Sequence, residues 1–185
     1  MTRTKDEAKI TAISEAVFEL TATQGLAALS MSKVAKLAGI SSATIYIYYA
    51  DKKDMLSRIY ENVKTKMDAG LSEKIVQQTT LDDKIRTASQ HFVKVFSEHP
   101  REARYMNAVL LSPELVDEAC LNLAAQTATP LLQLFSEIQQ DDSYIKASSL
   151  VYTNFFRVPF LLLEAGASRS DIAQATELMI QTFHV

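Results

Sequence analysis

Apolar residues recur along most of this chain at spacings of three and four, which predicts amphipathic α-helices. Polar residues suited to helix starts and glycines suited to helix ends separate these stretches, and no strand pattern competes with them. The pattern predicts an all-α protein of about nine helices, covering approximately 5–24, 31–38, 42–49, 52–70, 80–99, 101–111, 113–140, 144–165 and 171–184. Two of these helices contain a proline, so we expect a kink or break near Pro130 and a kink at Pro159.

The composition supports long helices. The 185 residues include four glycines and four prolines, where average usage predicts roughly 22 of the two together. The single cysteine, Cys120, excludes an intramolecular disulfide framework and a cysteine-rich zinc site, and we interpret it as a small buried apolar residue. The polar start and the lack of 18 consecutive apolar residues predict a cytoplasmic protein without a membrane span.

The stretch from Ser30 to Lys53 carries the functional signal. Ser30 is suited to begin one short helix and Ser41 another, and Gly39 lies in the three-residue turn between them. Two short helices joined by such a turn form a helix-turn-helix pattern. Ile45 and Tyr49 stand four residues apart and are expected to face inward.

The second of these helices has the residue types that a DNA-reading helix needs. Small or hydrogen-bonding side chains stand near its start, where such a helix approaches base edges: they are Ser42, Ala43 and Thr44. Tyr46 and Tyr48 add hydroxyl groups. Lys52 and Lys53 follow where the next helix begins, and there a lysine and free helix amides both attract phosphate. Further basic residues extend a positive surface: Arg3, Lys5, Lys33 and Lys36.

The charge distribution agrees with two functional halves. The net charge is −3, but residues 1–66 hold ten Lys or Arg against seven Asp or Glu, and the remainder holds nine against fifteen. A mildly basic segment therefore precedes an acidic one.

This segment resembles the TetR/AcrR family of bacterial transcriptional regulators. The resemblance covers roughly residues 10–60 and rests on an apolar helix from Ile10 to Leu20, then on the following groups in order: Gly25, Val34-Ala35, Ala38-Gly39-Ile40-Ser41, Thr44-Ile45-Tyr46, Tyr48-Tyr49 and Lys52-Lys53. It implies a DNA-binding domain over 1–50, a ligand-binding and dimerisation domain over 51–185, and a homodimer paired through the last two predicted helices.

The resemblance also assigns DNA contacts by position: Ser32, Ser42, Ala43, Thr44, Tyr46, Tyr48 and Lys52. Two positions depart from the family pattern. Ile47 stands where many members place a polar or aromatic side chain, and Ala43 has no group that hydrogen-bonds to a base, although its methyl group can contact a thymine methyl.

Apolar and aromatic residues of the later helices are candidate walls of a ligand pocket or, alternatively, simple core: Phe92, Phe96, Tyr105, Met106, Phe135, Tyr152, Phe155 and Phe156. Arg157 interrupts the apolar run of residues 150–163, where it either contacts an acidic ligand or pairs with a carboxylate such as Glu164. His91 is a weaker candidate, and a structural role suits it better.

The leading hypothesis is a transcriptional regulator of the repressor type that binds a palindromic double-stranded DNA operator as a homodimer and is released by a small-molecule effector. The alternative is a helical ligand-binding or scaffold protein without sequence-specific DNA binding. We expect no enzyme, because no nucleophile–base set or Gly-rich phosphate loop appears. We also expect no cofactor and no metal, since His91, His99 and His184 lack metal-ligand spacing.

Overall fold

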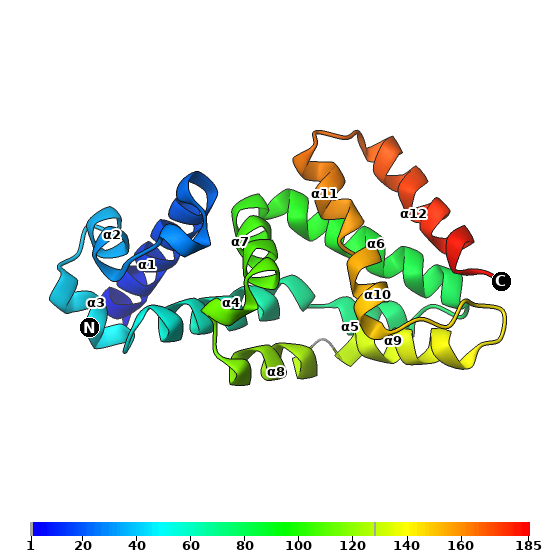
Figure 1. The fold of residues 1–185 in the computed structure, drawn as a ribbon, viewed down its shortest axis with the longest axis horizontal. Coiled ribbons are helices and arrows are strands. Elements are labelled where there is room, and N and C mark those ends of the chain that lie inside the picture. The colour runs from blue at the N-terminus through cyan, green and yellow to red at the C-terminus, as the bar shows by residue number, and fades with distance from the viewer. Residues whose placement is uncertain (1, 128) are drawn as a thin grey trace. The chain divides into compact units, whose positions relative to one another are not determined.

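The chain is described by a computed structural model that covers residues 2–127 and 129–185, with side chains described for residues 7–122 and 130–185. Arg3 and Lys5 therefore lie outside the described side chains. The described residues form twelve α-helices and two 3₁₀-helices and contain no β-strand, which confirms the all-α class (Figure 1).

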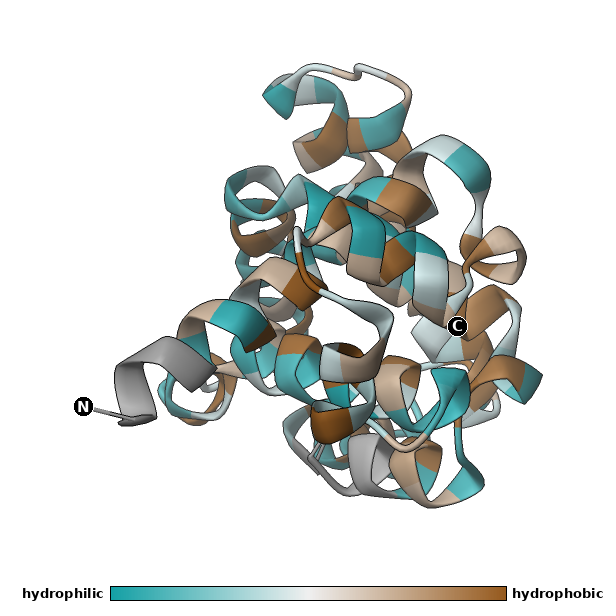
Figure 2. Ribbon diagram, turned by 90° about the vertical axis from the view of Figure 1, so that its left-hand side faces the viewer, coloured by the Kyte–Doolittle hydropathy of each residue, from teal (hydrophilic) through white to brown (hydrophobic). Residues whose placement is uncertain are grey.

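The helices are α1 (Thr2–Gln24), η1 (Leu26–Ala28), α2 (Met31–Leu37), α3 (Ser42–Tyr48), α4 (Lys52–Asp68), α5 (Leu71–Val76), α6 (Leu81–Glu98), α7 (Pro100–Leu111), η2 (Pro113–Leu115), α8 (Glu118–Thr127), α9 (Thr129–Gln140), α10 (Ser149–Phe155), α11 (Val158–Glu164) and α12 (Arg169–Phe183). Hydrophobic and hydrophilic residues alternate along these helices as amphipathic helices require (Figure 2).

The chain divides into two compact units. Unit 1 comprises Met1–Lys66 and Pro100–Ala124, and unit 2 comprises Met67–His99 and Ala125–Val185. Unit 1 thus contains the helix-turn-helix segment together with nearly all of α4 and the whole of α7. Its core includes Ile13, Val34 and Leu56, which have no more than traces of exposed surface.

Two predicted helices are divided in the structure, and one short helix was not predicted. The predicted helix over 113–140 is divided into η2, α8 and α9, because Val116 takes an extended conformation and is buried, and the Asp117 amide donates to Ser57 Oγ at 2.8 Å. The kink or break expected near Pro130 falls next to residue 128, which lies outside the described residues: α8 ends at Thr127 and α9 begins at Thr129. A short helix, α5, was not predicted, although Leu71 and Ile75 stand four residues apart and both are buried.

The predicted helix over 144–165 is also divided. Residues 144–148 are not helical, because the Ile145 amide donates to the Phe183 carbonyl at 2.6 Å and the Val185 amide to the Ser143 carbonyl at 3.0 Å. A second break separates α10 from α11. Pro159 is the second residue of α11 and has no amide hydrogen for the carbonyl four residues earlier, which ends α10 at Phe155.

Polar side chains cap several of these helices, including the predicted caps Ser30 and Ser41. Ser30, Ser41 and Thr80 each accept a hydrogen bond from the backbone amide three residues on, and Asp51 Oδ1 accepts one from the Asp54 amide at 2.9 Å. Ser168 caps α12, through a reciprocal capping box with Asp171, because the helix begins two residues earlier than expected.

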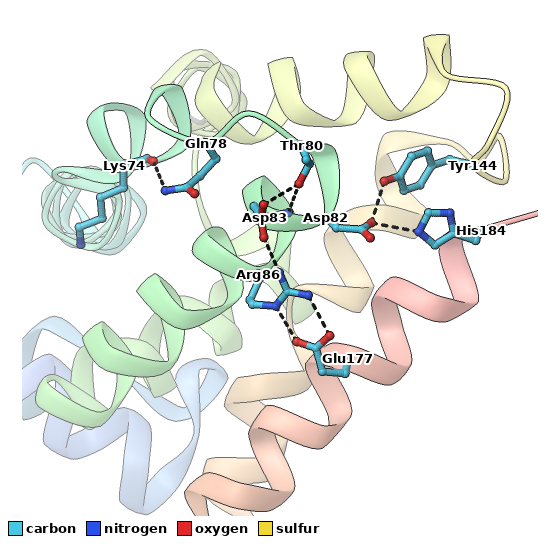
Figure 3. Close-up of polar contacts among 9 residues, drawn as sticks. All are labelled: Lys74, Gln78, Thr80, Asp82, Asp83, Arg86, Tyr144, Glu177 and His184. Atoms are coloured by element: carbon cyan, nitrogen blue, oxygen red, sulfur yellow. Dashed lines mark hydrogen bonds and ion pairs between the residues drawn. The ribbon is translucent and has the colours of Figure 1, made fainter.

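Asp82 at the start of α6 joins the chain's last residues to the segment before α10. Its Oδ1 atom accepts hydrogen bonds from Tyr144 Oη at 2.7 Å and from His184 Nε2 at 3.0 Å, and the rings of Tyr144 and His184 stack with centroids 4.4 Å apart (Figure 3). One cluster of unit 2 therefore holds residues more than 100 positions apart.

Candidate nucleic-acid interface

The turn between α2 and α3 is built by local interactions. The Ile40 amide donates to the Ala35 carbonyl at 3.0 Å, which closes the end of α2, and Gly39 adopts a positive φ of 69°. Ser41 then accepts a hydrogen bond from the Thr44 amide at 3.0 Å and begins α3. The sequence-predicted helix-turn-helix is therefore present, with both of its caps.

Helix α3 has a buried side and an exposed side. Ile45 is fully buried and Tyr49, just after the helix, is nearly so, as predicted. Ser42 and Ala43 are exposed, as are Tyr46 and Ile47, whose exposed fractions are 56% and 77%. The candidate interface is defined here as this exposed side of α3 together with Ser32 of α2 and Lys52 of α4.

The other candidate residues are more constrained. Thr44 is half-buried and its hydroxyl group lies 2.8 Å from Ser41 Oγ. Tyr48 is half-buried, and Lys9 Nζ of α1 lies 6.0 Å from the centroid of its ring. Ser32 is exposed at the start of α2, with its Oγ 3.1 Å from Ser30 Oγ. The structure thus brings the predicted residues onto one unit and leaves their DNA contacts as predictions.

Lys52 is held beside η1 by a contact that the sequence does not reveal. Its Nζ donates to the Ala27 carbonyl at 3.0 Å, while Lys33 Nζ donates to the neighbouring Ala28 carbonyl at 3.0 Å. Partial burial, followed by repulsion from Lys33, lowers the pKa of Lys52. Two lysines are therefore fixed on one short carbonyl-lined segment near the first turn of α4.

Arg58 is a residue of this site that sequence reasoning missed. Its Nη1 donates to the Tyr48 carbonyl at 2.6 Å, and its guanidinium lies 4.9 Å from the centroid of the Tyr49 ring. The last carbonyls of a helix have no partner within the helix, so Arg58 completes the C-terminal end of α3. The one sequence signal was its position four residues after Asp54, which lies 4.0 Å away.

Helix α7 stabilises the candidate interface through contacts with other helices of unit 1. Arg101 pairs with both Glu15 and Glu19 of α1, and its Nη1 lies 2.9 Å from Glu15 Oε2. The Tyr105 hydroxyl donates to the Leu56 carbonyl of α4 at 2.6 Å, and its ring packs 5.5 Å from that of Phe18. Because α7 touches both α1 and α4, it fixes the helices on either side of the helix-turn-helix.

The pocket candidates are divided between the two units. Tyr105 and Met106 are buried in unit 1, where Tyr105 has the structural contacts just described. In unit 2, Phe92 and Phe96 of α6 form a chain of rings with Phe160, at centroid distances of 5.5 and 5.8 Å. That these residues bind a ligand remains a prediction.

A second aromatic group of unit 2 joins α9 to α10. The ring of Phe135 lies 5.3 Å from that of Tyr152 and 5.6 Å from that of Phe156, while Phe155 packs 5.0 Å from Phe183 of α12. Arg157 is half-buried between α10 and α11, and its Nη1 donates to Asn154 Oδ1 at 3.1 Å.

A groove of about 410 Å³ runs between α6 and α12 in unit 2. Val93, Ile172 and Thr176 are among the residues that line it. Arg86 and Glu177 also line it and form a two-pronged ion pair across the two helices, with N–O distances of 2.6 and 2.9 Å (Figure 3). Nothing in the sequence pattern indicated this groove, because its two walls are about 80 residues apart.

His91 and Cys120 have structural surroundings. His91 is buried, with Nε2 2.8 Å from the Met67 carbonyl and Nδ1 3.0 Å from Lys74 Nζ, and burial lowers its pKa. Cys120 is buried as predicted, its Sγ donates to the Ser57 carbonyl at 3.3 Å, and burial raises its pKa to about 11. Within the described ranges, no three metal-ligating side chains gather in one group, and no helix is long and apolar enough to cross a membrane.

Comparison with known proteins agrees with this geometry. Residues 13–59, from α1 into α4, match the family model of bacterial regulatory proteins of the tetR family. The chain is 30% identical over 88 residues to the fatty acid metabolism regulator protein of Bacillus subtilis, a match that spans 47% of this chain and 45% of that protein.

Solved structures share the fold over nearly the whole chain. A TetR family transcription regulator from Marinobacter aquaeolei matches 99% of this chain and 99% of its own, with a TM-score of 0.81 and 23% identity. FadR from Bacillus subtilis, solved in complex with stearoyl-CoA, matches 94% of this chain and 99% of its own, with a TM-score of 0.68 and 17% identity. Residues 13–59 thus form a helix-turn-helix domain of the tetR family of bacterial regulatory proteins, within an all-α fold that solved TetR family regulators share.

Proposed function

We propose that this protein is a ligand-responsive repressor that binds a near-palindromic operator as a homodimer and leaves it when a small molecule binds. The observation that carries the DNA-binding part is the exposed side of α3. Ser42, Ala43, Tyr46 and Ile47 face outward while Ile45 anchors the helix from behind. A helix held in this way is suited to enter a major groove.

The dimer part of the proposal rests on the surface of the last three helices. They expose large apolar side chains, which suit a face covered by a second copy: Leu150, Val151, Leu161 and Leu178. These residues belong to α10, α11 and α12, which cover the segments expected to pair. A two-fold dimer sets two recognition helices against half-sites in successive turns of DNA, so the operator is expected to be a near-palindrome.

The effector part rests on unit 2. Its groove of about 410 Å³ between α6 and α12 has the volume of a small-molecule site, and charged residues such as Arg86 and Arg169 lie on its walls. The aromatic clusters of the same unit supply apolar side chains. The Bacillus subtilis relative is a fatty acid metabolism regulator, and FadR is solved with stearoyl-CoA. Long-chain acyl-CoA is therefore the first class of effector to test. An effector releases DNA by binding the DNA-incompetent arrangement more tightly.

The test is binding of the purified protein to the DNA upstream of its own gene, measured by fluorescence anisotropy at several salt concentrations. We expect sequence-specific binding whose affinity falls steeply with salt, as phosphate contacts require. Stearoyl-CoA is then added, with free coenzyme A as the control. Binding without sequence preference would contradict the repressor proposal and favour a helical ligand-binding protein that does not read DNA.

A further inference from the structure

The most projecting edge of α3 is apolar. At roughly 100° of rotation per residue, Ala43 and Ile47 each lie within about 20° of the point opposite Ile45, which is fully buried. They stand four residues apart and form one ridge on the helix. Both side chains are exposed, and Ile47 has 77% of its surface accessible.

The hydrogen-bonding groups of α3 lie to the sides of this ridge. Ser42 and Tyr46 flank it on one side and Thr44 and Tyr48 on the other. The Thr44 hydroxyl is already within 2.8 Å of Ser41 Oγ, and the Tyr48 ring is half-buried beside Lys9. On the side of the helix that would reach deepest into a groove, the side chains are therefore purely hydrocarbon.

Among the base edges of the major groove, one group matches such a ridge. Thymine presents its C5-methyl group there, whereas the other bases present hydrogen-bond donors and acceptors. A polar base edge placed against Ile47 loses water and gains no hydrogen bond, so such a base is disfavoured. A thymine methyl group placed there removes apolar surface from water on both molecules.

Resting on the proposed function, we propose that Ala43 and Ile47 form a thymine-methyl reader and that Ile47 is the specificity-determining residue of α3. The operator half-site is then expected to carry at least one thymine that is recognised through its methyl group. Ser42 and Tyr46 supply hydrogen bonds beside this contact and do not replace it.

The experiment begins with duplexes enriched by the protein from a randomised DNA library. Each thymine of the enriched half-site is replaced by deoxyuridine in both half-sites, which removes the methyl group and leaves base pairing unchanged. For the unaltered protein we expect at least one position where the affinity falls about threefold to fivefold per methyl group. Ile47→Ala is expected to bind the thymine and deoxyuridine duplexes alike at that position.

Leu37→Ala is the matched control. Leu37 is an exposed apolar residue of α2 in the same unit, and this variant is expected to keep the full thymine-to-deoxyuridine difference. Ile47 is largely exposed, so its replacement leaves the core intact, which an unchanged circular dichroism spectrum verifies.

Three results would overturn the inference, and they are distinguishable. Enrichment of specific duplexes without any deoxyuridine effect refutes methyl reading and leaves the proposed function standing. An equal deoxyuridine effect in the unaltered protein and in Ile47→Ala refutes the role of Ile47. A library that yields no preferred sequence refutes the proposed function itself.

Discussion

Lys52 Nζ donates a hydrogen bond to the Ala27 carbonyl at 3.0 Å, so the first residue of α4 is tied to the 3₁₀ turn that follows α1. This contact holds the ammonium group beside the candidate interface and lowers its freedom to move. Partial burial, followed by repulsion from Lys33, lowers the pKa of the same ammonium group.

Lys52→Ala is expected to weaken DNA binding to nearly the same degree for every sequence, because a phosphate contact carries no sequence information. The slope of log affinity against log salt should fall by about 2 for a dimer, at about 0.9 per lost contact. Lys53→Ala is the control, since Lys53 is exposed and lies 3.8 Å from Asp117. An unchanged slope in Lys52→Ala would remove Lys52 from the interface.

Tyr46→Ala is expected to abolish operator binding while the protein remains folded and dimeric, because Tyr46 is exposed and makes up much of the polar flank of α3. Tyr46→Phe keeps the ring and loses the hydroxyl group, so its operator affinity should lie between those of the unaltered protein and Tyr46→Ala. Anisotropy titrations with the enriched duplex measure both. Full affinity in Tyr46→Ala would contradict the assignment.

Tyr105→Phe is expected to lower the free energy of unfolding by about 1 kcal/mol, because the substitution removes the buried hydroxyl group and with it the hydrogen bond to the Leu56 carbonyl. Tyr46→Phe, at an exposed position, should change stability little. Urea denaturation followed by circular dichroism compares them. If Tyr105 is purely structural, effector affinity is expected to be unchanged in Tyr105→Phe, and a large loss of effector binding with unchanged stability would instead support Tyr105 as a pocket residue.

Leu161→Glu combined with Leu178→Glu is expected to shift the protein from dimer to monomer, because each substitution places a charge on the proposed dimer face. Sedimentation velocity at several protein concentrations measures the shift. Val76→Glu, on α5 and 77% exposed, is the control and should leave the dimer intact. A dimer that survives the double substitution would place the two-fold interface elsewhere.

His91 predicts a loss of stability at mildly acidic pH. Burial lowers its pKa in the folded state, and Lys74 and Lys94 act in the same direction, while the Met67 carbonyl and Asp68 oppose them. The unfolded chain therefore binds the proton more readily, so stability is full above a pH of about 6.5 and declines as the pH falls below it.

The measurement for His91 is the free energy of unfolding of the unaltered protein and of His91→Gln at three pH values. These are about 7.5, 6.5 and 5.5, which bracket the ordinary histidine pKa of about 6.5. The variant should lose less stability across this range. Glu177 and Asp171 have lowered pKa values, so their contribution is lost only in more acidic solution and does not interfere. Parallel curves for the two proteins would contradict the prediction.

Short-range sequence patterns predicted the helix-turn-helix segment well. Ser30 and Ser41 cap their helices as expected, and Ile45 and Tyr49 face inward, because these outcomes depend on residues three or four positions apart. The same reasoning failed in the second half of the chain. There Pro159 ends one helix, and backbone pairing with residues 183–185 keeps residues 143–145 out of another.

The sequence by itself determined the all-α class, the helix-turn-helix and the tetR-family match of that segment, because helix periodicity, caps and the motif at residues 10–60 are local properties. Only the tertiary structure decided that Arg58 completes α3, that Tyr105 supports α4 and that Arg86 of α6 binds Glu177 of α12. In each of these contacts the partners are between 10 and 91 residues apart. Which residues form such pairs depends on how the helices pack. The periodicity along one helix does not indicate which helix packs against it.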